Sequence, residues 1–278
     1  LHGILKSRQE LKAHQEYQEH VGFEIVSIGN RIQFYVWTPT NIASFVEGQV
    51  YAQYPDAQIK QINPEDDYVH RIPENHYRSV IEVGLIEDEV LPIKTFPSFE
   101  VDPLAAITAT LTKLDSDQEI IGIQILARPV NDAWHKAAAQ KVAAIKAGKA
   151  PSGGKLIGQT IGALSKPPEE SSAPKPEISE RDKTRVTAIE EKSRKLGYQV
   201  KIRILYSAPP ENQASNRMKV QALLGAFKQF NTTNLNGFAS KGSSADGFSK
   251  YRGRHFLDKG FTLNIEELAS LYHLPHSN

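Results

Sequence analysis

A stretch rich in glycine, proline and serine divides this 278-residue chain into two segments, and it limits how the chain can fold. The stretch covers residues 148–180. Glycine enlarges the entropy that folding must overcome and proline cannot donate a backbone hydrogen bond, so such a stretch rarely joins a core. We therefore predict a flexible linker at 148–180 between one domain, 1–147, and a second domain, 181–278, which also suits the length.

The first segment shows the periodicities of strands that alternate with helices. Two runs rich in β-branched and aromatic residues, 23–28 and 32–37, flank Gly29-Asn30, a typical two-residue hairpin turn. A helical apolar stripe ends near Tyr54-Pro55, and Asp102-Pro103 is a strong helix start. The stripe consists of Ile42, Phe45, Val46 and Val50. Further strands are predicted at 57–62, 78–86, 90–94 (as hairpin partner of 78–86) and 120–127, and a helix opens at Asn131-Asp132.

The second segment repeats this alternation. In chain order we predict a helix (181–196), a strand (198–206), a helix (212–230), a polar loop (231–250), a short strand (256–263) and a last helix from Asn264 through Leu271. The helix over 212–230 is expected to turn Met218, Leu223 (or Leu224), Phe227 and Phe230 inward. Asn264 and Glu267 fit a capping box. The whole pattern predicts an α+β fold made of two ferredoxin-like (split βαβ) sandwich domains joined by the linker.

Composition excludes several classes of site. The chain has no cysteine, which rules out disulfides and thiolate chemistry and fits a cytosolic setting. No apolar run approaches the roughly 18–20 residues of a membrane-spanning helix, and no signal peptide is visible. The nearest match to a phosphate-binding loop, residues 148–156, has the wrong spacing and lacks the hydroxyl after Lys155. We therefore expect no cofactor, no metal and no enzymatic activity in this chain.

Two groups of histidine and carboxylate residues are candidates for chemistry. His273 and His276 lie three residues apart, but Pro275 separates them and no further ligand is at hand. A polar cluster after the predicted strand at 57–62 could hold a cation or a general base. It consists of Asp66, Asp67, His70, Glu74 and His76. We favour a solvated loop here, with a hydrolase that uses this cluster as an open alternative.

Charge is distributed unevenly along the chain. Residues 1–147 hold 13 Lys/Arg and 20 Asp/Glu, whereas residues 181–260 hold 16 Lys/Arg and 6 Asp/Glu, although the net charge is only +1. A basic half of this kind favours contact with a polyanion, either nucleic acid or an anionic membrane face. The alternative is a basic surface that serves solubility alone.

Basic residues interleaved with aromatic rings are typical of grooves that bind single-stranded nucleic acid, because charges meet phosphates and rings stack on bases. The second segment shows this pattern, so we predict sequence-independent, salt-sensitive DNA binding there. The predicted contact residues are Lys192, Arg194, Lys195, Lys201, Arg203, Arg217, Lys219, Lys241, Lys250, Tyr251, Arg252 and Arg254.

Several short motifs resemble the N-terminal, non-motor region of coupling-protein-like ATPases of type IV secretion and conjugative DNA transfer. The similarity is carried by the Asp-Pro helix start at 102–107, a Gln-Ile-Leu-x-Arg-Pro-like strand at 123–129 and the helix with Trp134-His135-Lys136. Residues 34–39, 49–55 and 266–275 fit as well, so the resemblance touches most of 20–147 and 181–278. The family's Walker motifs have no counterpart here, and none of its catalytic residues maps onto this chain.

The resemblance implies a non-catalytic accessory or assembly region of a membrane-associated, DNA-translocating ATPase, which ends in a helix that leads to a motor domain. The implied partners are DNA, the motor, secretion-channel proteins and further copies of the chain, at the cytoplasmic face of the cell membrane. The alternative is a cytoplasmic interaction scaffold that binds acidic protein surfaces or anionic lipid. Both expectations assign this chain to binding rather than to catalysis.

Overall fold

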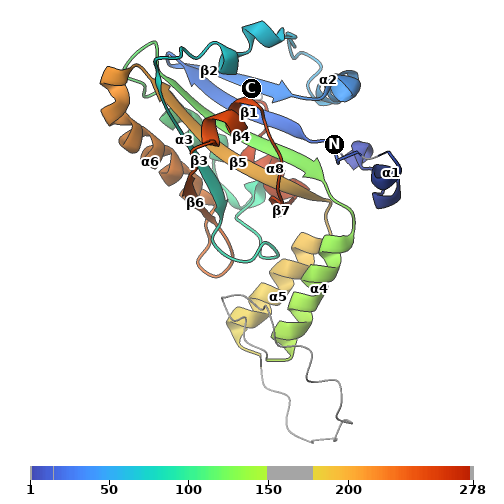
Figure 1. The fold of residues 1–278 in the computed structure, drawn as a ribbon. Coiled ribbons are helices and arrows are strands. Elements are labelled where there is room, and N and C mark those ends of the chain that lie inside the picture. The colour runs from blue at the N-terminus through green and yellow to red at the C-terminus, as the bar shows by residue number, and fades with distance from the viewer. Residues whose placement is uncertain (1, 15, 149–177, 276–278) are drawn as a thin grey trace, which may run out of the picture.

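A computed structural model describes residues 2–14, 16–148 and 178–275 (Figure 1). Its centre is one antiparallel sheet in the order β2-β1-β4-β5-β3-β6, and β7 pairs with the first residues of β5. The strands are β1 (Val21–Ile28), β2 (Arg31–Trp37), β3 (Tyr77–Leu85), β4 (Ile120–Pro129), β5 (Gly197–Ala208), β6 (Phe238–Ser243) and β7 (Phe261–Asn264). The α+β class predicted from the sequence is confirmed.

The sheet joins strands from both sides of the predicted linker. β4 pairs with β5 along its whole length, from Ile120↔Ser207 to Pro129↔Tyr198, and β3 pairs with both β5 and β6. The two expected ferredoxin-like sandwiches are therefore not found, because strands of 1–147 and 181–278 share one sheet. β4 and β5 are central strands with a partner on each edge, and their side chains are buried almost throughout, because both faces of the sheet are covered there. Residues 149–177 of the predicted linker lie outside the described residues.

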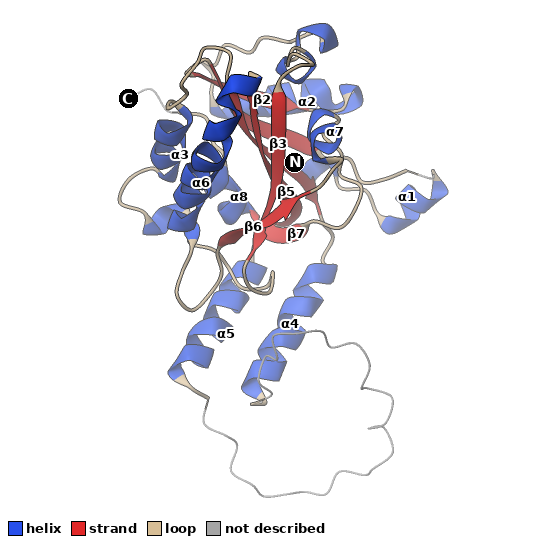
Figure 2. Cartoon of the chain, turned by 60° about the vertical axis from the view of Figure 1, so that its left-hand side comes forward, coloured by secondary structure: helices blue, strands red, loops and turns tan. Residues whose placement is uncertain are grey.

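One face of the sheet is apolar and is covered by helices (Figure 2). Alternate strand residues such as Ile25, Ile123 and Ile204 point to this face and form the largest core cluster. The covering helices are α3 (Pro103–Leu111), α6 (Asn216–Phe227) and α8 (Ile265–Leu271). The apolar side chains of the strands and of these helices therefore pack together in one core.

Local signals in the sequence explain several element boundaries. The β1–β2 hairpin turns at Gly29 and Asn30, which have φ angles of 52° and 64°, as a type I′ turn requires. The Asp102 side chain accepts from the Leu104 N–H and so caps α3. The predicted capping box at the start of α8 is also present. These three predictions are confirmed.

α4 (Ala133–Lys146) and α5 (Glu180–Ser193) form a helical pair that projects from one end of the sheet (Figure 1). Buried Val142 and Ile145 of α4 belong to the same small core cluster as Val186 and Ile189 of α5, separate from the main core. α4 follows β4 and α5 precedes β5, so the pair continues the two central strands of the sheet.

The remaining helices are short or lie at the rim. They are α1 (Arg8–Ala13), α2 (Ala43–Gln53) and α7 (Gly247–Arg252). α7 lies on the second face of the sheet, where its Tyr251 packs with Val26 and Leu205 in another core cluster. Within the three described ranges, none of the helices has the length and apolar character needed to cross a membrane.

Three element predictions and the predicted orientation of Met218 are wrong. Residues 57–62 and 90–94 form no strand, and the predicted polar loop 231–250 contains β6 and α7. The 90–94 segment is instead held by single bonds, such as that from the Lys94 N–H to the Phe230 carbonyl. Met218 is 65% exposed rather than inward, because α6 turns Val220 and Leu223 toward the core instead.

Candidate functional site

The second face of the sheet carries a row of polar residues across its four central strands. Glu24, Gln124, Arg203 and Glu82 are direct neighbours in the strand register. Gln124 donates to Glu24 at 2.8 Å and accepts from the Arg203 Nη1 at 3.1 Å. Arg203 reaches Glu82 at 3.4 Å. Strand alternation places this row opposite the apolar core, where loop segments and α7 cover it.

Arg254 completes the row with two carboxylates. Its guanidinium donates to Glu24 at 2.9 and 3.0 Å and to Asp67 at 2.7 and 3.1 Å. Burial by itself lowers the pKa of Arg254, but the charge of Glu24 and the bonds to both carboxylates raise it overall. The Tyr68 hydroxyl donates to Glu24 and lies 2.8 Å from the Tyr251 hydroxyl. Every buried charge in this network is paired, which holds α7 and the 67–72 segment on the sheet.

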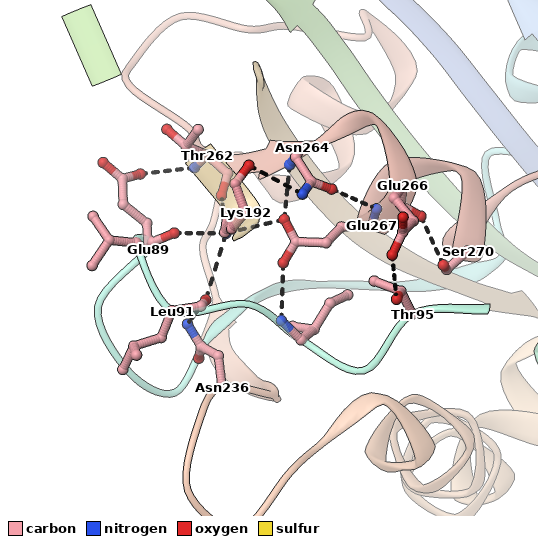
Figure 3. A network of polar contacts seen from close by, with 12 residues as sticks. Glu89, Leu91, Thr95, Lys192, Asn236, Thr262, Asn264, Glu266, Glu267 and Ser270 are labelled. Carbon is pink, nitrogen blue, oxygen red and sulfur yellow. Dashed lines mark hydrogen bonds and ion pairs between the residues drawn. The ribbon is translucent and has the colours of Figure 1, made fainter. Parts of the chain in front are cut away.

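A second buried network lies where the helical pair meets the sheet (Figure 3). Lys192 of α5 forms an ion pair with Glu267 of α8 at 3.0 Å, and both side chains are almost fully buried. The Lys192 ammonium also donates to the carbonyls of Glu89 and Thr262, at 2.7 and 3.0 Å. Glu267 accepts from the Ile93 N–H at 2.9 Å. The pair thereby fixes the irregular segment 89–93 between α5 and α8.

Most residues predicted to contact DNA make internal contacts. Lys192, Arg203 and Arg254 belong to the two networks, and Tyr251 is fully buried. Four further lysines pair with carboxylates of this chain: Lys195 with Glu266, Lys201 with Asp258, Lys219 with Asp115 and Lys250 with Asp246. A buried cation cannot contact a phosphate unless it leaves its carboxylate, which strands a buried charge.

Only four of the predicted contact residues are exposed, and they do not gather on one surface. They are Arg194, Arg217, Lys241 and Arg252. Arg217 lies on α6 over the apolar face, whereas Arg252 lies on α7 over the opposite face. Lys241 lies on β6 at the sheet rim, and Arg194 follows α5 at the base of the helical pair. Among these four residues the structure therefore forms no continuous basic groove.

Sequence reasoning missed a stack of rings and cations at the open end of the polar face. The Arg128 guanidinium carbon lies 4.1 Å from the Phe256 ring centroid, and His20 packs between Phe256 and Trp37. Arg128 donates twice to Gln199, and no carboxylate of the described residues lies within 4.0 Å of it. Burial lowers the pKa of Arg128. Arg128 lies in the acidic segment, so the uneven charge of the two segments did not indicate it as a binding residue.

A charged pocket of about 340 Å³ lies where β3 and β7 separate along β5. Two of the predicted contact residues, Lys201 and Lys241, line it together with Lys259. Lys201 pairs with Asp258 at 2.6 Å, and Lys259 pairs with Glu89 at 3.1 Å. Glu82 and Glu87 line it as well. Three lysines thus face four carboxylates here, and the pocket offers no excess positive charge for a polyanion.

A mostly apolar groove of about 200 Å³ lies between α2 and the β1–β2 hairpin. Three residues of the helical stripe predicted from the sequence line it: Phe45, Val46 and Val50. Only Val46 of these is buried, and Phe45 is 40% exposed. The groove is lined by Phe23, Val36, Phe45, Val46, Gln49, Val50, Gln53, Tyr54, Tyr272 and Leu274. An exposed apolar surface with a polar rim is typical of a site of protein contact.

The polar cluster proposed for hydrolysis does not converge on one point. Asp67 pairs with Arg254, whereas His76 is buried and hydrogen bonds with Ser207 at 3.3 Å. Burial lowers the pKa of His76. His70 and Glu74 are exposed. In the described part of the chain, no three or more His, Asp or Glu residues are placed so that they could hold a metal ion, and His276 lies outside it.

Comparisons with known proteins add one finding. A family model with the description Domain of unknown function (DUF8128) matches residues 1–278, and thus both segments of the chain. No curated protein matches the chain, and no solved structure does. Any functional conclusion therefore rests on the sequence motifs and on the geometry above.

Proposed function

Because this chain belongs to the DUF8128 family, whose description names no function, we propose from its sequence and geometry that it is a non-catalytic assembly domain. We further propose that it serves a membrane-associated, DNA-translocating ATPase of the conjugation type. That link rests on the motifs at 102–107, 123–129 and 266–275. In this proposal the domain holds a protein partner, the motor or a channel protein, in the apolar groove beside α2.

One contrast supports the assembly role above all. The charged side chains in the two buried networks form internal ion pairs, whereas Phe45 of α2 is exposed and Val50 is half-buried. Phe45 and Val50 line the groove without filling it. A partner that inserts apolar side chains there gains about 25 cal/mol for each Å² of apolar surface removed from water. The groove is thus a favourable docking site for an apolar segment of a partner.

The test is co-elution of this chain with the isolated motor domain of a coupling-protein-like ATPase from the same genome. We expect the wild type to co-elute and Val50→Glu to abolish co-elution, because the variant places a charge in an apolar contact. Met218→Glu, at an exposed position of α6 away from the groove, is the matched control and should co-elute. Failure of the wild type to co-elute, or equal behaviour of the two variants, contradicts the proposal.

DNA contact is a second candidate, and Arg128 is the observation that favours it. A half-buried guanidinium that lies against an aromatic ring, and that has no carboxylate within 4.0 Å among the described residues, can bind a phosphate next to a base. Filter binding to single- and double-stranded DNA at low and high salt tests this. Arg128→Gln should weaken binding more than Lys136→Gln, which removes an exposed charge from α4. Absence of any binding at low salt rules out the DNA contact.

A further inference from the structure

β2 forms one border of the sheet, and its outer edge has no strand partner in the described structure. Ile28 and Arg31 flank the two-residue turn, so they form a hydrogen-bonded pair, and bonding alternates from there. Consequently Gln33 bonds inward to β1, whereas Ile32, Phe34 and Val36 direct their N–H and C=O groups outward. These outward donors and acceptors have no described hydrogen-bond partner.

The edge of β2 also lacks the features that usually block pairing. Residues 32–37 contain no proline and no charged residue. The opposite border, β6, is different: it carries Lys241, Gly242 with a φ of 92°, and a shift in register against β3. Such devices prevent strands of other chains from adding to a sheet. The contrast indicates that β2 is a pairing edge.

We propose that two copies of this chain pair antiparallel through β2, about a two-fold axis at Phe34. The outward backbone groups of Ile32, Phe34 and Val36 are centred on Phe34, so each meets a complementary group of the second copy. Side chains match as well, because cross-strand neighbours are then Ile32 with Val36, Gln33 with Tyr35, and Arg31 with Trp37. No pair sets like charges opposite one another, which is the self-complementarity that a two-fold interface requires.

Val36 of β2 and Phe45 of α2 line the same groove and are 36% and 40% exposed. This apolar surface enlarges the contact. The inference deepens the proposed assembly role, since it names one partner as a further copy of this chain. Val36 and Phe45 also line the groove proposed for the motor, but the two tests stay separate, because Val50→Glu changes the groove whereas Gln33 does not line it.

Gln33 provides a test that leaves the core unchanged, since its side chain is exposed. Light scattering of the purified chain over a concentration series should give a mass rising toward twice 30.9 kDa. In the proposed pairing the two Gln33 side chains are diagonal neighbours across the axis, so Gln33→Lys or Gln33→Glu sets like charges together. Each variant alone should dissociate at concentrations where the wild type is paired, and an equimolar mixture should restore pairing.

A disulfide supplies an independent measurement, because the chain has no cysteine. Opposite residues of a hydrogen-bonded antiparallel pair have Cα atoms about 5.5 Å apart, within the range that a disulfide spans. Phe34→Cys should therefore form a covalent dimer under mild oxidation, whereas Met218→Cys, on exposed α6, should not.

Each result decides the inference. A wild-type mass of 30.9 kDa at every concentration overturns it. Dimers that ignore both Gln33 substitutions and fail to cross-link through Phe34→Cys overturn it too, because they use another surface. Dimerisation with no motor co-elution keeps this inference and removes the motor as the partner. If the chain stays monomeric but co-elutes with the motor, the proposed function is kept and this inference is overturned.

Discussion

Gly122 lies on β4 directly beneath the Tyr251 side chain, where a Cβ atom would come within 2.5 Å of the tyrosine hydroxyl. Tyr251 cannot move aside easily, because it is fully buried and its hydroxyl is hydrogen-bonded to that of Tyr68. We expect Gly122→Ala to lower the free energy of unfolding by about 1–3 kcal/mol through overpacking. Urea unfolding followed by circular dichroism measures the change.

Gly225 is the matched control for this substitution. It lies on the exposed side of α6, and a Cβ there meets no atom within 4 Å. Gly225→Ala should raise the free energy of unfolding by up to about 1 kcal/mol, because alanine loses less backbone entropy in a helix. Equal effects of the two substitutions would mean that Tyr251 does not occupy the space above Gly122.

His20 predicts a loss of stability in mild acid. Burial lowers its pKa from the ordinary 6.5, which outweighs the hydrogen bond to the Arg254 carbonyl. The unfolded chain therefore binds a proton near pH 6.5 more readily than the folded protein does. The stability from neutral His20 is complete above that pH and decreases as the pH falls below it.

The measurement is the urea midpoint at about pH 7.5 and about pH 5.5, on either side of the histidine pKa. The urea concentration at the midpoint should be lower at the acidic pH than at the neutral pH, and His20→Gln should make this difference smaller. His76, whose pKa burial also lowers, contributes in the same direction, so His76→Gln is the companion variant. A midpoint that does not change over this range for the wild type contradicts the prediction.

At the scale of elements, the Lys192–Glu267 pair joins α5 to α8 inside the protein. Glu267→Gln leaves the Lys192 ammonium buried without its counter-charge, so we expect a loss of about 3–5 kcal/mol. The exposed pair between α4 and α5, Lys146 with Glu190, is the control. Glu190→Gln should cost about 0–1 kcal/mol. Thermal unfolding of both variants decides, and similar melting temperatures would show that the buried pair does not fasten the helices.

Elements with a strong local signal were predictable, and those formed by long-range pairing were not. The capping residues Asp102 and Asn264 are enough to predict the starts of α3 and α8, and Gly29-Asn30 predicts the first hairpin. β6 has little intrinsic strand character, since its Ser240, Lys241 and Gly242 are poor strand formers, and it exists because β3 pairs with it. Residues 57–62 show the reverse case: they alternate like a strand but have no strand beside them.

At the scale of the whole molecule, the linker prediction suggested two cores, but the strands interleave. The local sequence pattern predicts that β4 and β5 are strands, but it does not identify them as neighbours. The choice of partner depends on contacts between distant parts of the chain. The same limit applies to the candidate sites. The polar row from Glu24 to Glu82 and the stack around Phe256 bring together residues more than a hundred positions apart. Charge counted by segment could not reveal that Arg254 pairs with Glu24.

This interleaving predicts that neither segment folds alone. Residues 1–147 without the second segment lose β5, one of the two partners of β4. Residues 178–278 alone lose β3 and β4 on either side of β5. Each fragment should lack dispersed amide signals in an NMR spectrum, and the equimolar mixture should recover them, because the core needs both. A fragment that gives a folded spectrum by itself would restore the two-domain view.

The unequal borders of the sheet limit how far copies of this chain can add to one another. β6 carries Lys241 and a register shift, and the backbone of Thr262 in β7 is bound by Glu89 and Lys192. Beyond Arg31, β2 presents an uncharged row of backbone groups with no described partner. A chain with a single pairing edge uses that edge completely when it binds one further copy. Strand addition through β2 would therefore end at two subunits and could not build a fibre.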